Sequence, residues 1–167
     1  MTTVDLFAIK QRIVTILKAD TTNLWNAQPS TKSKFRKIEA GSPSPKAIQE
    51  PPLPRCWVTS DDAVAIVKPL GVIANNISQG EEYDIRIKII FATEAKDGPS
   101  TEEKIDDFTK SIISNLETNY DLRAPGGAES TRVAESSEVL SIRELPSYLK
   151  GDRVRGRAII FRVIVRA

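Results

Sequence analysis

Residues 154–165, close to the end of the chain, constrain the fold more than any other segment. Their middle is apolar on both faces of an extended strand, because Ile159 and Phe161 alternate with Ile160 and Ile164. A strand with two apolar faces belongs inside a sheet that is covered on both sides. We therefore expect a central strand here, with a second covering layer that a neighbouring subunit could supply.

Period-two alternation also marks residues 83–91 as a strand, with apolar side chains on one face and Asp84, Arg86 and Lys88 on the other. Two shorter apolar runs, 56–59 and 139–143, are further strand candidates, and 64–67 is a short apolar stretch that ends before Pro69 and Gly71.

Apolar side chains recur every three to four residues in two other segments, which predicts amphipathic helices over 3–19 and 100–119. Thr2 or Thr3 is the expected N-cap of the first helix. The second helix is preceded by Pro99 and opens on a capping-box pattern from Ser100 to Glu103. The expected fold is therefore α+β: a mostly antiparallel sheet of about four to five strands packed against two helices.

Residues 26–55 have a different composition, since they hold six of the ten prolines and six basic residues. Proline fixes φ and removes a backbone donor, so little regular structure is expected. The exception is near Lys34–Glu39, where Phe35 and Ile38 could anchor a short edge strand. We expect one domain over residues 1–167, in which 26–55 is a long basic proline-rich arm. Such an arm either reaches over a neighbouring subunit or remains a surface loop.

Charge is unevenly distributed, although the formal net charge is only +2. Successive segments 1–25, 26–55, 56–149 and 150–167 carry +1, +4, −8 and +5. Three readings remain open: unequal solvated surfaces, complementary patches between copies of the chain, and nucleic-acid binding. The third is the weakest, because the basic residues are not interleaved with the aromatics of a single-strand platform.

Catalytic chemistry finds little support in the sequence. There is no histidine, and the lone Cys56 excludes an internal disulfide and a cysteine-based metal cluster. Neither a GxxxxGK[ST] phosphate loop nor a GxGxxG motif is present. We expect no enzymatic activity, no metal and no cofactor. Since no apolar run reaches the roughly 20 residues of a membrane helix, and no signal peptide is recognisable, we expect no membrane association and an intracellular protein.

The order of expected elements resembles that of the tail-terminator and tail-completion (tail-to-head joining) proteins of tailed bacterial and archaeal viruses. The resemblance covers most of the chain and rests on pattern, without a diagnostic motif. It is carried by Val4–Lys18, Ile38–Pro43, Leu53–Val58, Tyr83–Phe91, Ile105–Leu116 with Asn119 and Leu122, and Ala158–Val165.

This resemblance implies a structural virion protein, assembled in the host cytoplasm, that forms a homo-hexameric ring at the neck. Such a ring caps the tail tube, stops its polymerisation and binds the head connector, while DNA passes through its channel without specific binding. The family has no catalytic residues to transfer. We expect an acidic channel, drawn from residues 56–149. Another neck or head-closure ring protein, or a small nucleic-acid-binding accessory protein, is the alternative.

Ten residues are candidates for contacts with other subunits or partners. Arg153, Arg155 and Arg157 have a two-residue period, so on a strand they line one face and could meet phosphate, a partner's carboxylates or solvent. The full set is Phe35, Arg36, Ile38, Trp57, Arg86, Lys88, Arg153, Arg155, Arg157 and Arg162.

Overall fold

The structure is a computed structural model of the whole chain. It describes residues 4–26, 33–49, 53–69, 72–73, 77–78, 81–95, 98–146 and 153–166. Thr2, Thr3 and the parts of the predicted arm at 27–32 and 50–52 lie outside the described residues.

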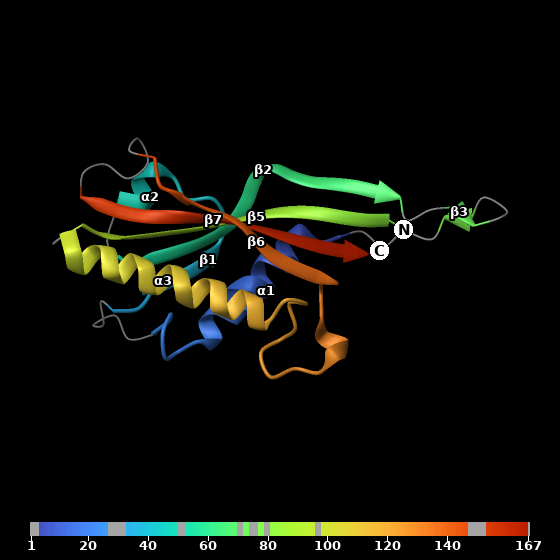
Figure 1. Ribbon diagram of the computed structural model, residues 1–167, viewed down its shortest axis with the longest axis horizontal. Helices are drawn as coiled ribbons and strands as arrows, with labels where there is room; N and C mark the ends of the chain where they lie inside the picture. Colours follow the sequence, from blue (N-terminus) through green and yellow to red (C-terminus); the bar gives the residue numbers. More distant parts are fainter. Residues whose placement is uncertain are drawn as a thin grey trace.

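A five-stranded sheet in the order β1-β2-β5-β7-β6 forms the centre of the molecule. The strands are β1 Lys37–Ala40, β2 Arg55–Pro69, β5 Glu81–Glu94, β6 Ser136–Glu144 and β7 Val154–Arg166. Only β1 and β2 run parallel, and every other pair is antiparallel. The predicted α+β class with a mostly antiparallel sheet is therefore confirmed. A small ribbon of β3 (Val72–Ile73) and β4 (Ile77–Ser78) lies beyond the ends of β2 and β5 (Figure 1).

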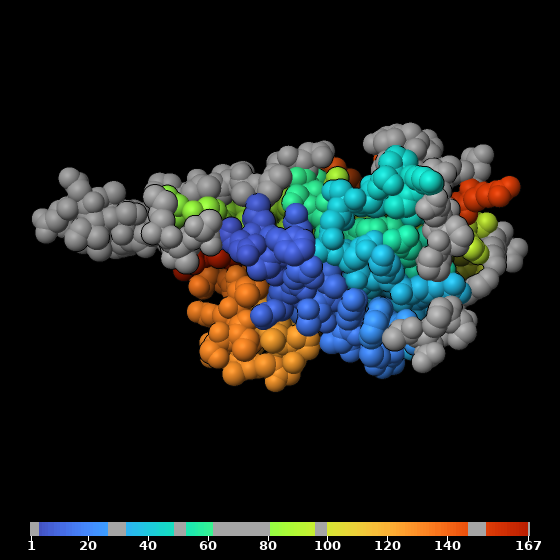
Figure 2. All heavy atoms as spheres, turned by 180° about the vertical axis from the view of Figure 1, so that it is seen from behind, coloured from blue at the N-terminus to red at the C-terminus, as the bar shows by residue number. Residues whose placement is uncertain are grey.

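Two helices, α1 (Leu6–Ala19) and α3 (Gly98–Thr118), pack on one face of this sheet. The main core lies between them and the strands, and it contains Ile13, Ile87, Phe108 and Phe161, each at most 2% exposed. Seen from behind, α1 lies between the residues around η1 (Glu129–Thr131) and those around β1 (Figure 2).

Both helices begin at different residues from those predicted. The N-cap of α1 is Asp5, whose carboxylate accepts a hydrogen bond from the Ala8 amide at 2.9 Å, so the expectation of Thr2 or Thr3 was wrong. Helix α3 already begins at Gly98, which places Ser100 inside the first turn rather than at the cap. Proline suits the first turn of a helix, because the first backbone donors have no partner within the helix and its missing N–H costs nothing there.

The predicted strand at 56–59 and the apolar stretch at 64–67 are parts of one strand, β2. Its pairing with β5 shifts register between Ser60 and Ala65, so residues 61–64 are accommodated as an irregularity opposite Arg86. The acidic pair within this stretch interrupted the apolar pattern in the sequence and concealed the continuity of the strand.

Strand β7 lies inside the sheet and is buried on both faces at its middle, as predicted, with Ile159, Ile160 and Phe161 at most 4% exposed. Part of the second covering layer comes from the chain itself. A smaller apolar cluster lies on the face opposite to the two large helices, and it includes Ile48 of α2 (Pro45–Gln49) and Trp57 of β2.

Residues 33–49, the longest described part of the predicted arm, contribute to both cores. Strand β1 lies at the sheet edge where a short strand was predicted, while α2 was not predicted because prolines surround it. Phe35 and Ile38 belong to the main core and are 0% and 1% exposed.

Candidate interaction surfaces

Three of the ten candidate contact residues are buried within the subunit. The Phe35 ring stacks on Phe108 of α3 with a centroid separation of 4.2 Å, and it meets Phe91 of β5 at 5.8 Å. Ile38 lies in the same core, and Trp57 is 2% exposed in the smaller cluster on the opposite face. These three side chains stabilise the subunit, and they present almost no surface to a partner.

Trp57 belongs to a polar network at the β1–β2 pair. Glu39 accepts hydrogen bonds from Trp57 Nε1 at 3.0 Å and from the Arg55 guanidinium at 2.8 Å, and Lys37 lies 3.0 Å from its second oxygen. Burial alone would raise the pKa of the Glu39 carboxyl, but the hydrogen bonds and charges of Lys37 and Arg55 outweigh burial and lower it. The basic arm is thus tied to the sheet by charge as well as by its buried phenylalanine.

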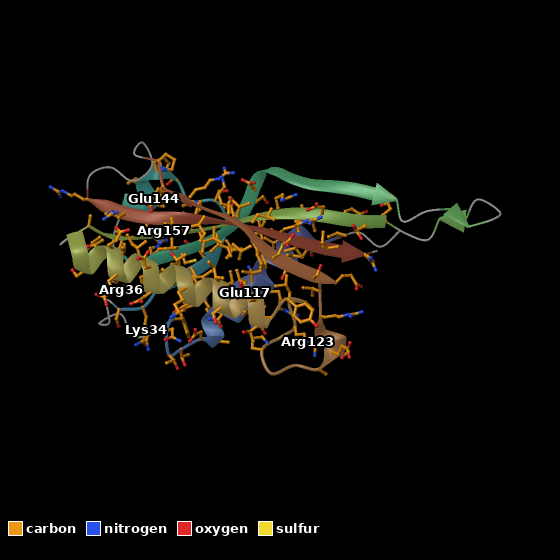
Figure 3. All side chains as sticks on the ribbon, in the orientation of Figure 1. Lys34, Arg36, Glu117, Arg123, Glu144 and Arg157 are labelled. Carbon is orange, nitrogen blue, oxygen red and sulfur yellow. The ribbon has the colours of Figure 1, made fainter. Side chains whose placement is uncertain are left out.

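Arg155 and Arg157 share a face of β7, as their spacing predicted, and both point toward α3 of the same subunit. Arg155 lies 2.6 Å from Glu102, while Arg157 contacts Glu102, Asp106 and Glu144, the last two at 2.7 and 3.0 Å. Figure 3 shows Arg157 and Glu144 side by side near α3. Arg153, at the start of this row, is exposed.

Burial alone would lower the pKa of Arg157, but hydrogen bonds to Glu144 and Asp106 outweigh it and raise the pKa. Carboxylates of the same subunit therefore already occupy two of the three guanidinium groups that the sequence suggested for phosphate or partner contacts.

Arg86, Lys88 and Arg162 lie on the face opposite to α1 and α3, at the end of the sheet away from α2. Asp84 is the centre of this array: it is 3% exposed, and its oxygens lie 3.2 Å from the Arg86 guanidinium and 3.0 Å from that of Arg162. Hydrogen bonds to Asp84 and Glu138 raise the pKa of Arg162. Lys88 pairs with Asp61 of β2 at 3.4 Å.

We call this array the charged face. Its members are Asp61, Glu82, Asp84, Arg86, Lys88, Glu138, Arg162 and Arg166. The array holds four acids and four bases, and each makes an ion pair with another member, so the charged face has no net charge. The sequence predicted which face of the strand at 83–91 is polar, but not that its charges pair across four strands.

A groove of about 830 Å³ lies between α3 and residues 20–23 and 33–34. Asp20 lines it and accepts a hydrogen bond from Asn115 Nδ2 at 2.7 Å. Burial would raise the pKa of Asp20, but hydrogen bonds from Asn115, Asn23 and the Thr22 backbone lower it. Acids and lysines both line this groove, so it has no single charge preference.

The described residues contain no group of three or more histidine, cysteine, aspartate or glutamate side chains placed to hold a metal ion. Cys56 is fully buried, and burial strongly raises the pKa of its thiol. The side chain fills space in the main core, and a thiol so placed is inert. None of the helices in the described ranges combines the length and apolar character that crossing a bilayer requires.

Three exposed apolar side chains were not predicted from the sequence. Tyr120, Leu140 and Ile142 are 51%, 40% and 46% exposed, and they lie on or beside β6, the outermost strand of the sheet. The predicted strand at 139–143 located two of them. Its position at the sheet edge depends on pairing between distant segments, which a single sequence does not give.

Searches with this sequence found no matching protein-family model and no matching curated protein. Among solved structures, a chain in the virion of a native gene transfer agent (GTA) particle is similar. The two chains share 17% identity with a TM-score of 0.43, and the alignment covers 97% of this chain and 98% of that one.

Proposed function

We propose that this chain is a structural virion protein that forms a ring at the neck of a tailed particle. The ring caps the tail tube, stops its polymerisation and joins the tail to the head. The observation that carries the proposal is the charged face, a stretch of sheet whose eight ionic side chains neutralise one another.

A neutral, ion-paired surface suits a channel for DNA. Phosphate binding is driven by uncompensated lysine and arginine, which release counterions from the DNA. On the charged face every such group already has a carboxylate partner within 3.4 Å. We therefore assign this face to the channel, where DNA slides past without being held. In this proposal the channel is lined by ion pairs without net charge, and not by the acidic lining expected from the charge of residues 56–149.

Capping follows from the symmetry of a ring. Each subunit presents one patch to the next around the axis, and the two axial faces of the ring differ. One axial face resembles the surface on which tube rings stack. The other axial face binds the head connector and does not bind a further tube ring. The tube and the connector are thus the proposed partners, and a hexamer is the proposed assembly.

Electron microscopy of the purified full chain, alone and mixed with a tail-tube protein, tests this role. We expect closed rings that attach to one end of each tube and arrest its growth. Single subunits under every condition, with tube length unchanged by the protein, would contradict the proposal. Attachment to a head connector but not to tubes would indicate another neck or head-closure ring.

Ion pairs between β7 and neighbouring elements of the same subunit weaken the nucleic-acid-binding alternative. Its main candidates were the arm and the row Arg153, Arg155 and Arg157, and two of this row, Arg155 and Arg157, are held by Glu102, Asp106 and Glu144. If the alternative held, DNA affinity would be clear at low salt and fall steeply as salt rises. We expect no measurable binding at low salt.

A further inference from the structure

Strand β6 forms one open edge of the sheet. It runs from Ser136 to Glu144, pairs with β7 on one side, and has no strand on its other side among the described residues. Its outer backbone groups are therefore available to another chain. Long open edges are an aggregation hazard unless a defined partner covers them.

Exposed apolar surface gathers along this same edge. Of the four large apolar side chains that are exposed in the described part of the chain, Leu140 and Ile142 belong to β6 itself. A third, Tyr120, lies beside it, since Ser137 Oγ donates a hydrogen bond to the Tyr120 carbonyl at 2.6 Å. Apolar side chains flanking free backbone donors are typical of edges that bind a further strand.

The opposite edge of the sheet is β1 with residues 33–36 before it, and the charge of this stretch complements that of the β6 edge. The backbone of Phe35 is already bridged to Trp25, so within the described residues the open backbone of this edge lies in Lys37–Ala40. Residues 135–144 carry three glutamates and one arginine, a net charge of −2. Residues 33–40 carry Lys34, Arg36 and Lys37 against Glu39, a net charge of +2. The Lys37 side chain is 54% exposed, and Arg36 Nε is buried without a hydrogen-bond partner in the described residues.

We infer that the β6 edge of one subunit docks on the β1 edge of a second copy of this chain, continuing the sheet from subunit to subunit. Because the two edges lie at opposite ends of one sheet, the contact is head-to-tail, and a repeated head-to-tail contact builds a ring when the rotation between neighbouring subunits closes. Within the described residues, the part of β2 beyond Val58 also has no strand on its outer side, but it fits less well, since residues 61–69 carry a net charge of −1, the same sign as the β6 edge. The inference rests on the proposed function and names the surfaces that would build its ring.

Backbone geometry provides a selective mutation. The Leu145 amide donates to the Gly156 carbonyl of β7, and amide directions alternate along a strand, so the Ile142 amide points away from β7 to the open edge. Ile142→Pro therefore removes an outward donor and keeps the bonds to β7, and proline is tolerated on edge strands. Ile142→Val is the matched control, because it keeps the amide and most of the apolar surface.

Self-association of the full chain is measured by sedimentation and native mass spectrometry. We expect Ile142→Pro to weaken assembly about tenfold or more, because a hydrogen bond and its neighbouring contacts are lost. Ile142→Val should assemble like the parent chain. Lys37→Glu, which takes the β1 edge from +2 to zero, should weaken assembly in the same way. One-step urea unfolding of each variant shows that the subunit itself is intact. A small decrease in the midpoint is expected for Lys37→Glu, because it also removes the exposed Lys37–Glu39 pair.

Mixing the two defective variants is the decisive step. The Ile142→Pro chain keeps an intact β1 edge and the Lys37→Glu chain an intact β6 edge, so together they should form heterodimers that cannot close a ring. Rings that form equally well from Ile142→Pro would overturn this inference and leave the proposed function standing. A parent chain that never assembles, even with tail-tube protein, would overturn both.

Discussion

Replacing Phe35 with alanine probes how firmly the proline-rich arm belongs to the fold. The ring is 0% exposed, stacks on Phe108 at 4.2 Å and meets Phe91 at 5.8 Å. Truncating a buried phenylalanine costs about 3–5 kcal/mol, and this range includes the cavity left behind. Aromatic pairs contribute roughly 0.5–1.5 kcal/mol beyond the area they bury, so a value in the upper half is expected.

A loss of this size is a large share of the roughly 5–15 kcal/mol that stabilises a typical domain. For a chain of this length each kcal/mol lowers the melting temperature by about 2–4 °C, which predicts a decrease of roughly 8–20 °C. Urea and thermal unfolding followed by circular dichroism measure it. Phe7→Ala is the control, because Phe7 is 59% exposed and its truncation should change stability by less than about 0.5 kcal/mol.

The opposite outcome would refute the reasoning about the arm. If Phe35→Ala and Phe7→Ala shift the unfolding midpoint equally, residues 33–40 do not complete the core, and β1 cannot serve as a rigid edge for a second copy. Phe35→Leu is a second variant, for the case in which Phe35→Ala is too unstable to purify. It retains most of the apolar volume and should lose less than Phe35→Ala.

Three further outcomes follow from close contacts and buried groups. Gly156→Ala should lower the urea midpoint by an amount worth about 1–3 kcal/mol or more, because an added Cβ would lie 1.9 Å from the Phe91 carbonyl oxygen; an unchanged midpoint would contradict that close approach. The folded pKa of Asp20 lies below its ordinary value, so its stabilising contribution is present above the unfolded pKa and disappears as pH falls through the folded pKa. Asn115→Ala should weaken this acid dependence in unfolding curves measured across that range, and an identical pH profile would count against the hydrogen bond. Cys56 should react with a thiol reagent only as fast as the chain opens, since burial raises its pKa; rapid labelling of the native protein would contradict its burial.

Elements with a strong local pattern were predictable from the sequence. The alternation at Tyr83–Phe91 and the two-faced apolar run before Val165 gave β5 and β7, and helical spacing gave α1 and α3. In these segments the intrinsic structural preference of the residues and their burial in the core favour the same element, so the sequence pattern predicts the structure correctly. Helix starts were less predictable, because several residues near each boundary are able to cap.

The sheet order and the ion pairs were not predictable, because they depend on contacts between distant segments. Nothing local indicates that Asp84 meets Arg162, 78 residues further on, or that Arg157 points to α3. The short helix α2 was missed because proline usually interrupts helices, although Pro45 occupies the first helical position, where it is well tolerated. Pairing across the sheet also decides that β6 is an edge, and this makes Leu140 and Ile142 surface residues.

The most direct test of the central proposal is the mass of the purified full chain under native conditions. We predict a closed assembly of several subunits, with six times the 18.5 kDa subunit mass as the expected value. The same sample should show no affinity for DNA at low salt. A chain that stays at one subunit mass at every concentration, also in the presence of tail-tube protein, would contradict the proposed ring.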